Sequence, residues 1–129
     1  MISGLSGEVF AFDTYFGLST IEFLECFSRS AKVKFMTVNV HDKGPRLDRS
    51  VKDFIKEFPN IQIRASQGAG EMHDRFVVDQ NCMLMLGHGL KDLAKKDSFV
   101  VVLDRKFAGD TATRALHWFD RHWKNGVQI

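Results

Sequence analysis

Two periods of hydrophobic and polar positions run along the chain, and each period predicts a different kind of element. Apolar residues at every third or fourth position predict three helices: one capped by Ser19 or Thr20, one at residues 46–57 and one at residues 111–124. The order of helices and strands predicts an α/β fold in two or three layers. Short apolar or alternating runs predict six strands, at residues 9–12, 32–40, Ile61–Ala65, Arg75–Val78, Cys82–Leu86 and 99–103.

Two of the predicted strands, at residues 32–40 and 99–103, are rich in apolar residues. Such runs are typical of strands buried on both faces between helices, so we expect both inside the sheet. Residues 79–81 separate the strands Arg75–Val78 and Cys82–Leu86 and fit a tight turn, which predicts an antiparallel hairpin. We therefore expect a mixed β-sheet flanked by helices.

Composition and charge fit one domain over residues 1–129. Hydrophobic residues make up 44% and charged residues 26% of the 129 positions, which is ordinary for a folded domain of this size. The formal net charge of +2 gives no general attraction to polyanions. Anion binding must therefore come from a local group of side chains.

Cysteine usage and hydropathy bear on location and partners. Cys26 and Cys82 show no CxxC or Cys/His ligand spacing, so we expect neither a disulfide framework nor a zinc site. The start of the chain lacks the pattern of a signal peptide, and no apolar run reaches about 18 residues. We expect a cytoplasmic protein with no membrane partner. The sequence shows no amphipathic segment with a basic rim, and a lipid substrate is therefore less favoured than nucleic acid.

Candidate chemistry begins at His73 and Arg75, at the start of a predicted strand. Because side chains alternate along a strand, His73 and Arg75 point to the same face. Arg presents a planar fork of donors to phosphate oxygens, and His changes charge near neutral pH, so the two together suit a phosphate group. Asp13 ends the first predicted strand, where ligand sites of α/β sheets gather.

This stretch resembles the active-site motif of the phospholipase D superfamily, His-x-Lys-x4-Asp-x6-Gly-Ser, in the variant with Arg in place of Lys. His73 and Arg75 fall on the His and Lys positions, and Gly87 falls on the Gly position at the same spacing. The strand-helix-strand order before His73 also suits this family. The resemblance implies a phospholipase D-like fold.

The same register contains two departures from the motif. Gln80 stands at the Asp position, with Asp79 one residue earlier, and His88 stands at the Ser position. The resemblance therefore leaves two functions open. One is a phosphodiesterase or nuclease that acts on nucleic acid or another phosphodiester, and the other is a catalytically degenerate module for phosphate binding or dimerisation.

If the chain is an enzyme, the resemblance implies attack on a phosphodiester by a histidine, which forms a phosphohistidine without a metal or other cofactor. In this scheme His73 is the nucleophile or the acid, and the basic partner Arg75 neutralises charge. Asp97 stands near the position of an acid that orients the histidine. The implied phosphate-binding residues are Arg75, Gly87, His88 and Gly89.

The family's reaction uses two motifs, and this chain contains one. A homodimer would bring two copies of His73 and Arg75 into one site. The alternative is that the chain is part of a longer protein that carries the second motif elsewhere.

Structural roles compete with these functional ones. Arg75 can pair with Asp74 or Asp79 on the surface, and Asp79 itself fits a turn. In the last helix, two histidines and two tryptophans fit surface or packing roles: His117, Trp118, His122 and Trp123.

Overall fold

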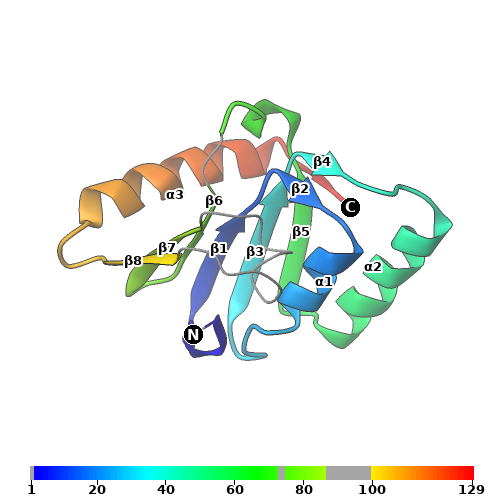
Figure 1. Cartoon of the computed structure of the whole chain (residues 1–129), viewed down its shortest axis with the longest axis horizontal. Coiled ribbons are helices and arrows are strands. Elements are labelled where there is room, and N and C mark those ends of the chain that lie inside the picture. The colour runs from blue at the N-terminus through cyan, green and yellow to red at the C-terminus, as the bar shows by residue number, and fades with distance from the viewer. Residues whose placement is uncertain (1, 73–74, 87–99) are drawn as a thin grey trace.

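A seven-stranded sheet forms the centre of the computed structural model, which describes residues 2–72, 75–86 and 100–129 (Figure 1). Its strand order is β8-β7-β6-β1-β3-β5-β9, and a separate two-stranded sheet contains β2 and β4. The elements, in chain order, are η1 (Ile2–Gly4), β1 (Glu8–Phe12), β2 (Tyr15–Phe16), α1 (Leu18–Leu24), β3 (Lys32–Thr37), β4 (Asn39–Val40), α2 (Pro45–Glu57), β5 (Ile61–Ala65), η2 (Gln67–Ala69), β6 (Arg75–Val78), β7 (Cys82–Leu86), β8 (Val100–Asp104), α3 (Gly109–Lys124) and β9 (Val127–Gln128).

Strand direction changes between β1 and β6. On one side of this boundary, β1, β3 and β5 are parallel, with α1 and α2 in the connections between them. On the other side, β6, β7 and β8 follow one another as antiparallel neighbours, and β6 is antiparallel to β1. The predicted mixed sheet and its antiparallel β6–β7 hairpin are confirmed, and the bounds of both hairpin strands are as predicted.

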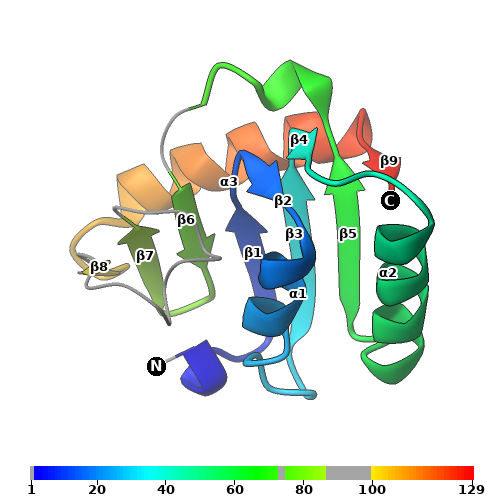
Figure 2. The ribbon, with the colours of Figure 1, turned by 45° about the vertical axis from the view of Figure 1, so that its right-hand side comes forward.

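Helices cover both faces of the sheet, so the fold has three layers (Figure 2). Alternate side chains of β1 belong to different cores, with Val9 and Ala11 in one and Phe12 in the other. The first core includes apolar side chains of α1 and α2, and the second includes those of α3. Side chains that alternate along a strand therefore pack against helices on opposite faces of the sheet.

Helix starts differ from the prediction for a local reason. Neither Ser19 nor Thr20 is the N-cap of α1, because the helix begins at Leu18 after Gly17. The Thr20 hydroxyl instead accepts a hydrogen bond from the Gly17 N–H at 3.1 Å. In α2, Pro45 is in the first turn. N–H groups there have no carbonyl partner within the helix, so the N–H that proline lacks costs the helix no hydrogen bond.

Two strand predictions were wrong. The predicted strand 32–40 divides after Thr37, because the Asn39 N–H turns to the Thr14 carbonyl at 2.8 Å and β4 pairs with β2. The predicted strand 99–103 is not interior: β8 lies at the margin of the sheet, where Val101 and Val102 are 51% and 57% exposed. An apolar run gave no means of telling a central strand from a marginal one.

Candidate functional site

The carboxyl end of the sheet, where the parallel strands β1, β3 and β5 finish, also contains the start of β6 and the end of β7 (Figure 2). Phe12 pairs with Phe76 across β1 and β6, so the next residue of β1's chain, Asp13, lies opposite Arg75. Arg75 in turn pairs with Leu86 at the end of β7. The start of β6, which follows His73 in the chain, and the end of β7, which precedes Gly87, are therefore neighbours at this end of the sheet.

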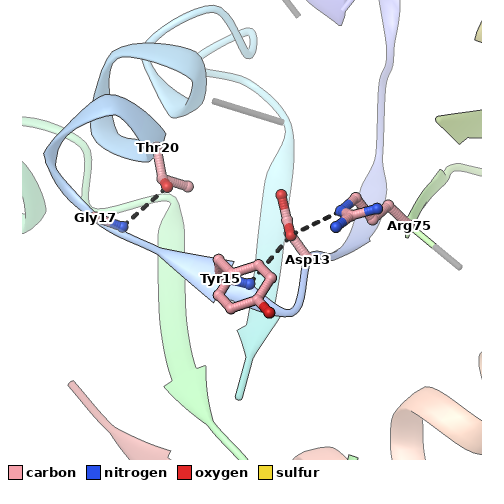
Figure 3. A network of polar contacts seen from close by, with 5 residues as sticks. All are labelled: Asp13, Tyr15, Gly17, Thr20 and Arg75. Atoms are coloured by element: carbon pink, nitrogen blue, oxygen red, sulfur yellow. Dashed lines mark hydrogen bonds and ion pairs between the residues drawn. The ribbon is translucent and has the colours of Figure 1, made fainter. Parts of the chain in front are cut away.

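Asp13 and Arg75 form an ion pair at this end of the sheet (Figure 3). The distance from Arg75 Nε to Asp13 Oδ1 is 3.2 Å, and the same carboxylate oxygen accepts the Tyr15 N–H at 3.1 Å. The Asp13 side chain is 2% exposed and that of Arg75 is 24% exposed. A buried carboxylate thus fixes the direction of a cation that remains accessible to solvent.

The use of Nε matters for the chemistry of Arg75. A guanidinium has five N–H donors, and four of them are on the two Nη nitrogens, which form the fork that binds phosphate oxygens. A carboxylate bound at Nε therefore orients this fork without occupying it by that bond. The negative charge of Asp13 also offsets part of the positive charge, which weakens the long-range attraction for an anion.

The sequence alternatives for Arg75 placed its partner at Asp74 or Asp79. Asp74 lies outside the described residues, and Asp79 follows the opposite end of β6, about 13 Å along the strand at ~3.3 Å per residue. Asp79 instead serves the turn between β6 and β7, as one interpretation of the sequence had it. Its Oδ1 accepts the N–H groups of Asn81 and Cys82 at 2.8 and 2.9 Å, and its Oδ2 accepts the Ser6 N–H at 3.2 Å.

Gln80, which stands at the motif's Asp position, is exposed in this same turn. Its amide lies beside Gly7, whose φ is +69° and where an added Cβ would be 3.3 Å from Gln80 Oε1. The turn is thus separated from Arg75 by the full length of β6. Neither Asp79 nor Gln80 joins the candidate site at the carboxyl end.

Arg75 is the predicted site residue that the structure describes. The other predicted residues lie outside the described ranges, and their roles stay predictions: His73, Gly87, His88, Gly89 and Asp97.

Sequence reasoning missed the residues that support Arg75. Asp13 was noticed as the end of a strand, but its pairing with Arg75 spans 62 positions and depends on strand register. Tyr15 and His41 were not singled out, although their rings contact each other in a tilted arrangement at a centroid distance of 5.1 Å. Within the described ranges, no three His, Cys, Asp or Glu side chains are grouped as for a metal ion, and no helix has the length and hydropathy for crossing a bilayer.

Several solved structures are similar to 99% of the chain, whereas no protein-family profile and no curated protein matches the sequence. Nuc from Salmonella typhimurium, a phospholipase D family member, has a TM-score of 0.68 at 15% identity over 85% of its own length. NucT from Helicobacter pylori has a TM-score of 0.67 at 12% identity over 86% of its length. TrmBL2, an archaeal chromatin protein with a novel mode of DNA binding, has a TM-score of 0.61 at 15% identity, and the chain spans 47% of its length.

These similarities define the class of fold, which in this chain is a mixed sheet between helices. The chain has a phospholipase D-like fold. The expectation that the sequence resemblance gave for the fold is confirmed.

Proposed function

We propose that this chain is a phospholipase D-like domain that binds the phosphodiester of nucleic acid and cleaves it where a second motif completes the site. The observation that carries the proposal is the ion pair by which the buried Asp13 orients Arg75. Arg75 lies at the start of β6, opposite the end of β7, after which Gly87 follows in the chain. The similarity to a phospholipase D family member and to a DNA-binding chromatin protein supports a substrate of this kind.

In the proposed reaction, an imidazole nitrogen of His73 attacks phosphorus. The bond from phosphorus to the leaving oxygen breaks, and a histidine of the second motif protonates that oxygen. Water then hydrolyses the phosphohistidine, with the second histidine accepting its proton. Arg75 neutralises the charge that develops on the phosphoryl oxygens, so no step requires a divalent ion.

The residues outside the described ranges complete this scheme. Gly87 and Gly89 would contact the phosphate, because small residues let backbone N–H groups approach it closely, and His88 would contact it from the motif's Ser position. Asp97 would orient His73. Two copies of the chain in a two-fold dimer supply the second motif most simply, and a second motif in a longer protein is the alternative.

The test is phosphodiester cleavage measured on single-stranded DNA, double-stranded DNA and a chromogenic phosphodiester, across about pH 5–8, where histidine titrates. We expect activity to persist in EDTA and to disappear in His73→Ala. Arg75→Ala should lose both substrate binding and turnover, while Arg75→Lys should retain part of both, since an ammonium keeps the charge but not the fork. Arg114→Ala, at an exposed position of α3, is the matched control and should behave as wild type.

Two results would contradict the enzyme. One is activity that EDTA abolishes, and the other is activity that persists undiminished in His73→Ala. Sedimentation that shows only monomer at tens of micromolar would contradict completion of the site by a second copy.

A degenerate phosphate-binding module is the second candidate, and a specific observation favours it. The Asp13 carboxylate offsets the charge of Arg75, and the motif's Asp position is occupied by Gln80 in a distant turn. This candidate is preferred if no substrate is cleaved while oligonucleotide binding still depends on Arg75.

A further inference from the structure

Tyr15 and His41 form an exposed aromatic pair next to the ion pair of Asp13 and Arg75. Their ring centroids are 5.1 Å apart at an interplanar angle of 31°, and Tyr15 is 40% exposed. Backbone bonds hold both residues: Tyr15 lies in β2, which pairs with β4, and the His41 N–H donates to the Phe16 carbonyl at 2.8 Å. The pair is therefore a fixed surface feature of the small β2–β4 sheet.

The position of Tyr15 relative to Arg75 is set by a shared atom. Asp13 Oδ1 accepts both the Tyr15 N–H and the Arg75 Nε–H, so one oxygen connects the backbone of the aromatic residue to the guanidinium (Figure 3). The backbone of an exposed aromatic residue is therefore two hydrogen bonds from the candidate phosphate-binding group.

Cations follow the aromatic pair along the chain. Lys43 is exposed before α2 and Arg46 is exposed in its first turn, and the same segment contains the exposed acids Asp42 and Asp48. The cation connected to the aromatic pair by described hydrogen bonds is Arg75, through Asp13. An aromatic face beside a cation is the combination that binds single-stranded nucleic acid, because bases stack on the rings while phosphates contact the charge.

We propose that Tyr15 and His41 form a base-stacking subsite beside the phosphate site, and that the chain therefore prefers nucleic acid with unpaired bases. This inference rests on the proposed function, since it assigns the group next to the phosphate that Arg75 binds. An unpaired base can leave its neighbours and stack on a ring, whereas a base in a duplex is already stacked and paired. Every base has a π-face, so the subsite should tolerate any sequence.

The two rings also contact each other in a tilted arrangement, and a purely structural role for the pair would require only that contact. Phe107 offers a comparison, because it is 91% exposed and follows β8, the marginal strand of the seven-stranded sheet, whereas Tyr15 lies in the separate β2–β4 sheet. A general contribution of exposed aromatic residues to binding would involve Phe107 as well as Tyr15.

The experiment compares binding of three probes: a single-stranded oligonucleotide, an abasic oligomer of the same length, and the duplex. Tyr15→Ala should weaken binding of the single strand by roughly 5- to 150-fold and leave the abasic oligomer and the duplex unchanged. His41→Ala removes the second ring without altering the backbone bond to Asp13 and should weaken the same probe. Tyr15→Phe keeps the ring and should bind as wild type, as should Phe107→Ala.

Each outcome separates the subsite from the phosphate site. If Tyr15→Ala weakens the single strand and the abasic oligomer equally, the Tyr15 side chain does not act through a base, and the stacking subsite is wrong. It is also wrong if Tyr15→Ala and His41→Ala both bind the single strand as wild type. Arg75→Ala should weaken all three probes. If it weakens none, the proposed function fails, whatever Tyr15 does.

Discussion

Replacing Asp79 by alanine should reduce stability without removing phosphate binding. The change deletes the acceptor of three backbone N–H groups, from Ser6, Asn81 and Cys82. Asn81 is exposed, so water replaces part of what is lost, and about 1 kcal/mol per hydrogen bond is an appropriate scale. The expected loss is therefore about 3 kcal/mol in the free energy of unfolding.

Asp79→Asn provides a graded comparison. Its amide oxygen can still accept from Asn81 and Cys82, but its NH₂ group would face the Ser6 N–H, so the loss should be about 1 kcal/mol. With an m-value of about 2 kcal/mol/M, the urea midpoint should fall by roughly 1.5 M for Asp79→Ala and by roughly 0.5 M for Asp79→Asn.

Gln80→Ala is the matched control, because Gln80 is the next residue of the same turn and is exposed. Its unfolding free energy should stay within about 0.5 kcal/mol of wild type. Urea denaturation followed by circular dichroism measures stability, and oligonucleotide binding per folded molecule measures function. The reasoning is refuted if Asp79→Ala denatures at the wild-type urea concentration, or if it is folded and loses the binding that depends on Arg75.

Other changes test packing and burial elsewhere. Thr37 Oγ1 is buried and has no hydrogen-bond partner among the residues that the structure describes, so Thr37→Val should raise the free energy of unfolding by on the order of 1 kcal/mol in urea denaturation. Gly126→Ala should cost about 1–3 kcal/mol in the same assay, because the added Cβ would lie 3.2 Å from a backbone oxygen of α3 and 3.2 Å from a side-chain carbon of β5. Gly4→Ala should change little, because no other atom of the described ranges lies within 4 Å of the added Cβ. Burial and neighbouring carboxylates raise the pKa of the Cys82 thiol, so mass spectrometry after iodoacetamide treatment at pH 8 should find exposed Cys26 modified first.

Local patterns in the sequence were enough for much of the fold. The strands Ile61–Ala65, Arg75–Val78 and Cys82–Leu86 have the predicted bounds, because each alternates or is apolar between clear breakers. Strands of two residues, such as Tyr15–Phe16 and Val127–Gln128, are too short to show any period. The marginal position of β8 depends on which strands pair, and pairing is not a local property.

The candidate site was less accessible to prediction for the same reason. Arg75 was found through its spacing in a motif, which is local. Asp13 became its partner only through the register of β1 with β6, and Tyr15 met His41 only through the pairing of β2 with β4. Contacts between segments far apart in the chain decide these neighbours, and a single sequence does not display them.

The central place of β1 has a consequence for synthesis on the ribosome. Once residues up to Ala65 have emerged, β1, β3 and β5 are present and can pair, but the hairpin that covers the other side of β1 has not been made. Unpaired strand margins attract other chains, and charged side chains discourage such pairing. In a nascent chain arrested before Arg75, β1 is therefore expected to be an unpaired edge strand, although it lies inside the finished sheet. The Asp13 carboxylate would place a negative charge at the end of this edge strand until Arg75 is translated.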